Sequence, residues 1–425
     1  MRYPTILSSL ALISYSRASQ PHYTHSQLAG ICNVADNNNV LSFGQKTFGL
    51  DHESCTHSRV DVQNTPVYHP WTHKPRCTPK NGLNETYCVY TNSNFADGRG
   101  ISFLTSPLVA KEIINLPAFT NPEIPENVNT FTDPPWEVRN IPGRGNGLFA
   151  TRTLYRGEEI LAATPVGVYM SDAFPVDYGL GYQYLNTAYK QLPKATREKV
   201  MMMAAHNAGD PIMERVNTNS FSGEFGGEPH FIVYPETARM NHDCRPNAMY
   251  YYDPATLIHS THASRTILPG EEITITYINI LQPRADRQEV LEMTWHFQCT
   301  CPLCTSSDEE VAISDARMQR IHEIHATLAD WSPNTMATPE LAEELITLYE
   351  LEKLHAAVAT GHMFASMAYN AIGDTDRAKQ FAERALKAGM VNSGVNGGNS
   401  DVDDMRAMLR DAESHWSYLA RPRKP

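Results

Sequence analysis

Three cysteines within six residues constrain the fold of this 425-residue chain more than any other feature of its sequence. They stand too close together to pair well as disulfides, but their spacing suits the thiolate ligands of one tetrahedral ion. Three sulfurs leave one position of the tetrahedron open, and only one other cysteine follows residue 88. A chance cluster of reduced thiols is the alternative. The sequence thus predicts a structural zinc site (Zn²⁺) with four ligands: Cys244, Cys299, Cys301 and Cys304.

The other four cysteines are widely and unevenly spaced and fit no zinc-finger pattern. They lie in a polar, turn-rich stretch between residue 20 and about residue 136. In an oxidising compartment they would most simply form two disulfides, and three pairings remain open. These residues are Cys32, Cys55, Cys77 and Cys88.

The N-terminus has the pattern of a secretory signal peptide. Arg2 precedes a short apolar run over residues 6–13, and small residues stand before a possible cut after Ala18. The run is shorter than the roughly 20 apolar residues that a membrane span needs, and no similar run follows. An amphipathic or disordered N-terminus, or a wrongly chosen start site, is the alternative. The pattern predicts a secretory or secreted protein without a membrane span.

Size and charge limit the remaining possibilities. A chain of this length with 41% hydrophobic residues is expected to form two or three domains. Its formal net charge is −12, which disfavours direct binding of nucleic acid through a basic face. An acidic chain is better matched to a partner protein that presents lysines.

Three further motifs precede the cysteine cluster. The segment 143–150 packs three glycines into five positions and leads into apolar, strand-like sequence, so backbone can approach a ligand there. A plain glycine-rich hairpin is the alternative. The segment 239–247 is polar and contains Cys244. The segment 270–277 alternates β-branched and polar residues, as a half-buried strand does, and ends at Tyr277.

In this order, the motifs resemble those of the SET-domain protein lysine methyltransferases. The matching residues are Gly145–Ala150, Asn241–Asn247, Gly270–Tyr277 and the pattern Cys-x-Cys-x-x-Cys at 299–304. The sequence Asn-Ser-Phe at 219–221 makes the resemblance closest to the SET-and-MYND branch. The close Cys/His pairs of the MYND zinc module are absent from the sequence pattern.

The resemblance implies an enzyme that transfers a methyl group from S-adenosylmethionine to a lysine side chain of a protein, histone or non-histone. Tyr277 would be the catalytic residue, oriented toward the transferring methyl group rather than acting as a base. Phe221, Tyr250 and Tyr252 would line the lysine channel, with an aromatic core stripe as the alternative. The residues expected to bind the cofactor are Arg144, Gly145, Asn146, Gly147, Asn241, His242, Tyr277 and Phe297.

The implied fold class is α+β: a β-rich SET fold with a zinc-binding post-SET segment, followed by an all-α C-terminal domain. The small-residue spacing within 365–387 resembles a tetratricopeptide helix pair, and Lys194–Asn207 has helical composition. We expect a signal peptide at 1–18, a cysteine-containing region with a Pro-rich linker at 19–135, a SET domain at 136–280 with an insertion at 170–235, a zinc segment at 281–306 and helices at 307–425.

Two functions of different classes follow from these features. The first is an active protein lysine methyltransferase. The second is a SET-fold interaction or scaffold protein with little or no transfer activity. The N-terminus points to the secretory pathway, whereas S-adenosylmethionine is an intracellular cofactor, so a nuclear or cytoplasmic location is the alternative if the signal is misread.

Overall fold

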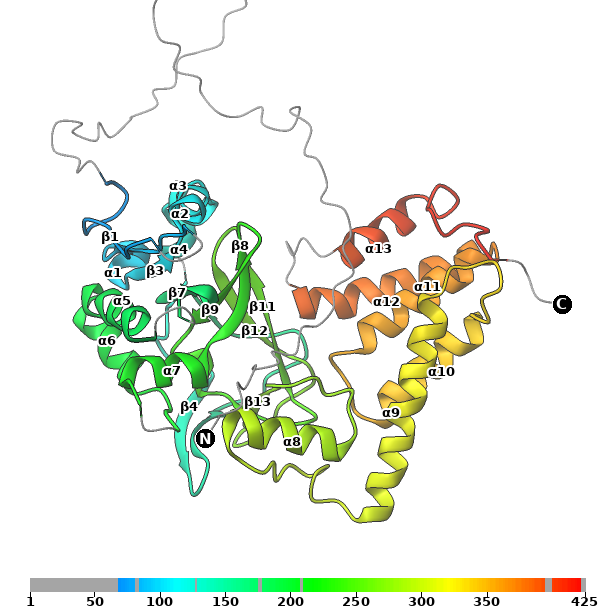
Figure 1. The fold of residues 1–425 in the computed structure, drawn as a ribbon. Helices are drawn as coiled ribbons and strands as arrows, with labels where there is room; N and C mark the ends of the chain where they lie inside the picture. Colours follow the sequence, from blue (N-terminus) through cyan, green and yellow to red (C-terminus); the bar gives the residue numbers. More distant parts are fainter. Residues whose placement is uncertain are drawn as a thin grey trace, which may run out of the picture. The chain divides into compact units, whose positions relative to one another are not determined.

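The computed structural model describes residues 68–80, 84–126, 128–174, 178–206, 209–393 and 400–421, all within one compact unit (Figure 1). The expected signal peptide, Cys32 and Cys55 lie outside these residues. Within them, three sheets come first along the chain and a set of helices follows, so the α+β prediction with a helical C-terminal region is confirmed.

The largest sheet has six strands and begins well before the predicted SET domain. Its third strand, Ile101–Thr105, is buried throughout and pairs in parallel with Gly167–Met170. Residues 76–105, which belong to the expected cysteine-containing region at 19–135, supply three of the strands of this sheet. In order across the sheet, the strands are β1 (Arg76–Cys77), β2 (Cys88–Asn92), β3 (Ile101–Thr105), β7 (Gly167–Met170), β9 (Glu228–Val233) and β8 (Phe221–Phe225).

Two smaller sheets bring together the motifs identified in the sequence. In the four-stranded sheet, the short strand Asn241–His242 runs parallel to Glu272–Ile275, which brings the second motif beside the strand that leads to Tyr277. The order in this sheet is β10 (Asn241–His242), β13 (Glu272–Ile275), β5 (Gly145–Ala150) and β4 (Trp136–Ile141). The three-stranded sheet consists of β11 (Ala248–Asp253), β12 (Ile258–Ala263) and β6 (Glu159–Ala163).

Helices cover the sheets in the first half of the chain. The predicted helix near 194–207 is observed over Lys194–Met201. Within the expected Pro-rich linker, Pro117 is the first residue of one short helix, and a second short helix spans Glu123–Glu126. The helices are α1 (Phe95–Gly98), α2 (Pro107–Ile113), α3 (Pro117–Thr120), α4 (Glu123–Glu126), α5 (Tyr178–Gln191), α6 (Lys194–Met201) and α7 (Pro211–Asn219), with 3-10 turns η1 (Ser171–Ala173) and η2 (Thr237–Arg239).

One of the predicted N-terminal disulfides lies among the described residues. Cys77 and Cys88 face each other across the pair β1–β2 and are bonded. Their register in the antiparallel pair brings the two sulfurs together. The disulfide prediction is confirmed for this pair.

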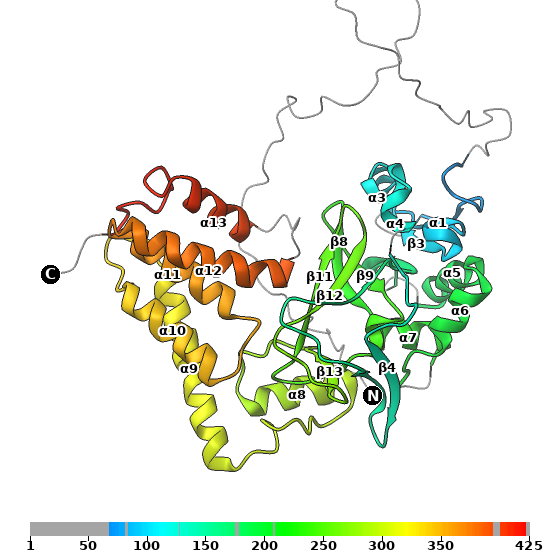
Figure 2. The same ribbon diagram turned by 180° about the vertical axis from the view of Figure 1, so that it is seen from behind.

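The C-terminal region is helical, as predicted. Alanines at spacings of three and four are buried between α11 and α12, and Gly373 makes the turn between them at φ 80°. Helix α12 contacts β11, and Figure 2 shows the two elements from behind. No described helix is long and apolar enough to cross a membrane. The helices are α8 (Arg284–Trp295), α9 (Asp308–Ala329), α10 (Pro339–Leu351), α11 (Val358–Ala371), α12 (Thr375–Ser393) and α13 (Ser400–Arg410).

Candidate functional site

A pocket of about 790 Å³ opens where the β4–β5 turn, strand β10, the end of β13 and the chain after α8 meet. This volume lies in the range of roughly 300–1,000 Å³ that small-molecule sites occupy. Segments more than 150 residues apart in the sequence therefore form one site. Of the residues predicted to bind the cofactor, the pocket is lined by Arg144, Gly145, Asn146, Asn241, His242, Tyr277 and Phe297.

The glycines of the first motif have two different structural roles. Gly145 has φ 73°, in the left-handed region that turns the β4–β5 hairpin toward the pocket. Gly147 does not line the pocket. A Cβ atom added there would lie 2.8 Å from Glu272 Oε1 and 3.0 Å from Asn241 Nδ2, so Gly147 makes room for the polar contacts beneath the pocket.

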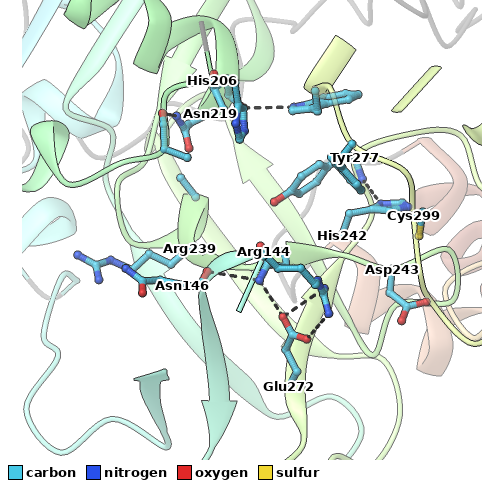
Figure 3. Close-up of a pocket in the computed structure, with 18 of the residues that line it drawn as sticks. Arg144, Asn146, His206, Asn219, Arg239, His242, Asp243, Glu272, Tyr277 and Cys299 are labelled. Atoms are coloured by element: carbon cyan, nitrogen blue, oxygen red, sulfur yellow. Dashed lines mark hydrogen bonds and ion pairs between the residues drawn. The ribbon is translucent and has the colours of Figure 1, made fainter. Parts of the chain in front are cut away.

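Glu272 connects the first and second motifs. Its carboxylate accepts from Arg144 Nη1 at 3.1 Å and from Asn241 Nδ2 at 2.8 Å (Figure 3). The same Asn241 amide also donates to the carbonyl of Asn146 at 3.3 Å. One carboxylate thus fixes two of the predicted cofactor-binding side chains.

His242 has a partner at each ring nitrogen. Nδ1 accepts from the backbone N–H of Tyr277 at 3.1 Å, and Nε2 lies 3.5 Å from the Cys244 sulfur. Burial lowers the pKa of His242 to about 4, so the ring is neutral at physiological pH. Because the ring is fully engaged inside the protein, only the backbone of His242 is available to a ligand.

The phenol of Tyr277 is held beside the pocket. Its hydroxyl donates to the carbonyl of Met240 at 2.7 Å, and its ring packs against those of His242 and Trp295 at 5.5 and 5.4 Å between centroids. Burial raises the pKa of Tyr277 above its ordinary value near 10, so the phenol stays protonated. A group in this state orients a neighbouring atom and does not remove a proton.

The chain after α8 closes one wall of the pocket. Trp295 ends the helix and its Nε1 donates to the carbonyl of Thr218 at 3.2 Å, while His296 adopts φ 58° and ends the helical turn. Phe297 then packs near His242, with 6.3 Å between ring centroids. These aromatic faces provide a surface on which a planar base can stack.

The four predicted metal ligands converge as expected. Their sulfurs all lie within 4.8 Å of one another, and Cys244 is 3.6 Å from Cys304 and 4.0 Å from Cys299. Tetrahedral zinc with bonds of about 2.3 Å would place its sulfurs about 3.8 Å apart. The donor set and the spacing therefore fit zinc.

A buried cation balances these sulfurs. Arg287 is 1% exposed and lies against Cys244 and Cys304. Burial alone would lower the pKa of Arg287, but the two sulfurs more than offset this effect and raise it. A positive charge is stable in such a place only beside negative charge, which four thiolates on a zinc ion supply.

The aromatic residues predicted to form the lysine channel do not line this pocket. Phe221 and Tyr250 pack on the buried ring of His259, at 4.7 and 4.8 Å between centroids, and Tyr252 lies beside Tyr234 in the same group. We call these five residues the aromatic cluster. The alternative of an aromatic core stripe describes their packing, although Tyr250 remains 38% exposed.

Several pocket residues were not predicted as site residues. Glu272 and Asn219 belong to the motifs Gly-Glu-Glu and Asn-Ser-Phe, so their positions carried a signal that the prediction did not use. Trp295 is an aromatic residue two positions before Phe297. His206 is exposed at the pocket, and no pattern in the sequence distinguishes it.

Comparison with known proteins agrees with this geometry. Residues 145–278 match the family model of the SET domain. This part of the chain is a SET domain. Over 276 residues it is 25% identical to the "Histone-lysine N-methyltransferase set5" of Schizosaccharomyces pombe, a match that covers 63% of this chain and 82% of that protein.

Other relatives match a shorter part. Over 108 residues the chain is 35% identical to the human "N-lysine methyltransferase SMYD2", covering 25% of this chain and about a quarter (24%) of that protein. The solved structure of the Neurospora SET domain protein DIM-5, a histone lysine methyltransferase, aligns with 34% of this chain and 53% of its own at 17% identity and a TM-score of 0.21, an overlap too small to support an argument. The named sequence relatives are lysine methyltransferases, so the enzyme is favoured over the scaffold protein.

Proposed function

We propose that this protein transfers a methyl group from S-adenosylmethionine to the amine of a lysine in a protein substrate. The observation that carries the proposal is the convergence, in one pocket, of the glycine turn, the Asn241–His242 strand, Tyr277 and Phe297. Relatives named as lysine methyltransferases support it.

The pocket residues match the chemical groups of this cofactor, which supplies an electrophilic methyl group on a sulfonium. Arg144 and the backbone of Gly145 and Asn146 would hold its methionine end. Asn241 and the backbone of His242 would bind its polar edges, and Phe297 would stack on its adenine. Chain segments fixed by Glu272 hold these groups ready, which lowers the entropic cost of alignment.

Tyr277 is proposed to orient the reacting groups. An in-line displacement needs an aligned and deprotonated amine and no covalent nucleophile on the enzyme. Because burial keeps the Tyr277 phenol protonated, the lysine must lose its proton to water before transfer. The phenol oxygen retains lone pairs that would stabilise the positive charge near the methyl group.

The cysteine cluster is proposed to hold structural zinc that shapes the pocket. Cys299 and Cys301 line the pocket themselves, and Phe297 lies two residues before Cys299. Gln288 of α8 bonds both the N–H and the carbonyl of Cys299 at 2.8 Å, which ties the cluster to the helix. Metal binding in a segment this short and polar provides order that side-chain packing does not.

The test combines cofactor binding with methyl transfer. Wild-type protein should bind S-adenosylmethionine in isothermal titration calorimetry and transfer radiolabelled methyl groups to core histones or to a heat-treated cell extract. Tyr277→Phe should reduce transfer at least tenfold, while Tyr155→Phe, a substitution at a 67% exposed tyrosine outside the pocket, should leave it unchanged. Zinc-loaded wild-type protein that binds no cofactor would contradict the proposal.

We also propose that the chain enters the secretory pathway through its N-terminal eighteen residues. The Cys77–Cys88 disulfide supports passage through an oxidising compartment. N-terminal sequencing of the native protein should find Ser19 as the first residue, and the protein should be recovered from culture medium. An intact N-terminus on protein found only inside cells would contradict this location.

A further inference from the structure

A buried carboxylate from the helical region reaches the second motif of the SET domain. Glu352 follows the end of α10 and is 5% exposed. It accepts from Arg245 Nη2 at 2.6 Å, from Arg317 Nη1 at 3.0 Å and from Ser314 Oγ at 2.7 Å. Two of these donors come from α9, and the third comes from the segment that lines the cofactor pocket.

Arg245 is held by both parts of the molecule. Its Nε donates to the backbone carbonyl of Glu352 at 2.5 Å, while its Nη1 donates to the carbonyl of Cys244 at 2.7 Å. Its backbone N–H donates to Asp243 Oδ1, also at 2.7 Å. The guanidinium therefore bridges Glu352 of the helical region and the backbone of Cys244, and the backbone of Arg245 holds Asp243.

The contacts continue from Arg245 into the pocket. Asp243 lines the pocket and its N–H donates to the carbonyl of Ile275 in β13 at 3.0 Å. Cys244 lies against His242, whose ring in turn accepts from the backbone of Tyr277. A displacement of Arg245 would therefore shift groups that line the pocket.

Glu352 is charged in the folded protein. Burial opposes its ionisation, but the hydrogen bonds from Ser314, Arg245 and Arg317 prevail and lower the pKa of Glu352. A buried carboxylate with three donors is rigid, because moving it leaves charges unpaired in a medium of low dielectric constant.

A second ion pair between the same helices has a purely local role and provides a comparison for Glu352. Arg320 of α9 and Glu344 of α10 form a bidentate pair at 2.7 and 2.8 Å. This pair joins the same two helices, and among the described residues its hydrogen bonds and ion pairs stay within α9 and α10. Glu352 differs because it also holds Arg245.

We propose that Glu352 is a positioning residue for the cofactor pocket, which it stabilises through Arg245. The helical region then sets the affinity of the SET domain for S-adenosylmethionine. This inference rests on the proposed function, since it concerns the same pocket. Glu352 lies 107 positions after Arg245 in the sequence. The inference gives Glu352 a role in binding a ligand that it does not touch.

The test compares Glu352→Gln with Glu344→Gln in the full-length, zinc-loaded protein. Calorimetry should show roughly five- to tenfold weaker S-adenosylmethionine binding for Glu352→Gln and no change for Glu344→Gln. The KM for the cofactor should rise by the same factor, and kcat at saturating cofactor should stay within twofold. Tyr349→Phe in α10 removes the hydroxyl group that contacts His325 of α9, and this variant controls for lost helical stability.

Each outcome decides between the two claims. Wild-type protein that binds no cofactor overturns the proposed function, whereas wild-type binding with unchanged affinity in Glu352→Gln overturns only this inference. Equal losses in Glu352→Gln and Tyr349→Phe, or loss of zinc from Glu352→Gln, also overturn it. If Glu352→Gln does not fold, the double variant Ser314→Ala/Arg317→Gln replaces it, because this variant removes the two α9 donors to the Glu352 carboxylate. It should show a smaller loss of affinity for S-adenosylmethionine. Unchanged affinity in this variant contradicts the proposal.

Discussion

The proposed cofactor pocket and the aromatic cluster differ in whether their buried polar groups have hydrogen-bond partners. In the pocket, both ring nitrogens of His242 and the hydroxyl of Tyr277 have partners. In the aromatic cluster, neither ring nitrogen of His259 nor the hydroxyl of Tyr252 has a hydrogen-bond partner among the described residues. His259 is fully buried between aromatic rings at 4.7–4.8 Å.

This difference distinguishes side chains that hold the backbone in one arrangement from side chains that only fill space. Partnered polar groups fix one arrangement of the backbone, because every alternative leaves a buried donor or acceptor unpaired. Aromatic side chains whose polar atoms have no partner contribute packing surface, but their buried polar atoms destabilise the folded state. The pocket therefore depends on specific bonds, whereas the cluster depends on shape.

Removal of the metal should give the largest effect and should affect only one of the two regions. Cys301→Ser is expected to abolish zinc binding, lower the melting temperature and weaken S-adenosylmethionine binding more than tenfold, because the wall of the pocket loses its order. Metal analysis and calorimetry measure this. Phe221→Leu in the aromatic cluster should keep full zinc content and cofactor affinity, and a loss of either would contradict the separation.

Substitution of the two buried histidines should give unequal losses of stability. His242→Leu is expected to lower the free energy of unfolding by about 2–4 kcal/mol, since it leaves the N–H of Tyr277 unpaired. His259→Leu removes two unpartnered nitrogens and should change stability by less than about 1 kcal/mol. Urea unfolding followed by circular dichroism measures both. Equal losses would show that His259 has a partner in solution.

The aromatic cluster should make the protein sensitive to mild acid. Burial lowers the pKa of His259 to about 3, whereas a histidine in the unfolded chain has a pKa of about 6.5. As pH falls from about 6.5 toward 3, the unfolded chain binds a proton that the folded chain does not, so stability is lost. His259→Leu should lose less stability than wild type between pH 7.5 and pH 5 in thermal melts. An identical loss would contradict the depressed pKa.

Two tyrosine substitutions should give small effects of opposite sign. Tyr252→Phe removes a buried hydroxyl without a partner and should stabilise by up to about 1 kcal/mol. Tyr277→Phe removes the donor to Met240 and should destabilise by about 1 kcal/mol. Differential scanning calorimetry resolves the two shifts. A destabilised Tyr252→Phe would indicate a bound water or ligand at that hydroxyl.

The sequence predicted the parts of this protein that depend on local patterns. Three cysteines of the cluster could be named from their short spacing, and Cys244 because it is the one other cysteine after residue 88. The α11–α12 pair followed from regularly spaced small residues, and strand β13 from its alternation. Seven of the eight predicted cofactor-binding residues line one pocket because they lie within or beside such motifs.

Apart from Cys244 and its cluster, patterns along the chain were insufficient where two interacting residues are distant in sequence. The sequence presents His242 and His259 as similar residues near strands, and only their surroundings give one two partners and the other none. Likewise, residues 76–105 join the main sheet through the pairing of β3 with β7, which their polar flanks concealed.

The sequence by itself indicated the cluster of four cysteines through residue type and spacing, and the resemblance of its ordered motifs to a known family indicated the SET fold. Tertiary structure alone decided which polar groups are paired, and it brought Glu352 to Arg245 and Trp295 to Tyr277. The physical reason is that the energy of a buried polar group depends on its neighbours in space, and these neighbours come from segments that no short motif connects.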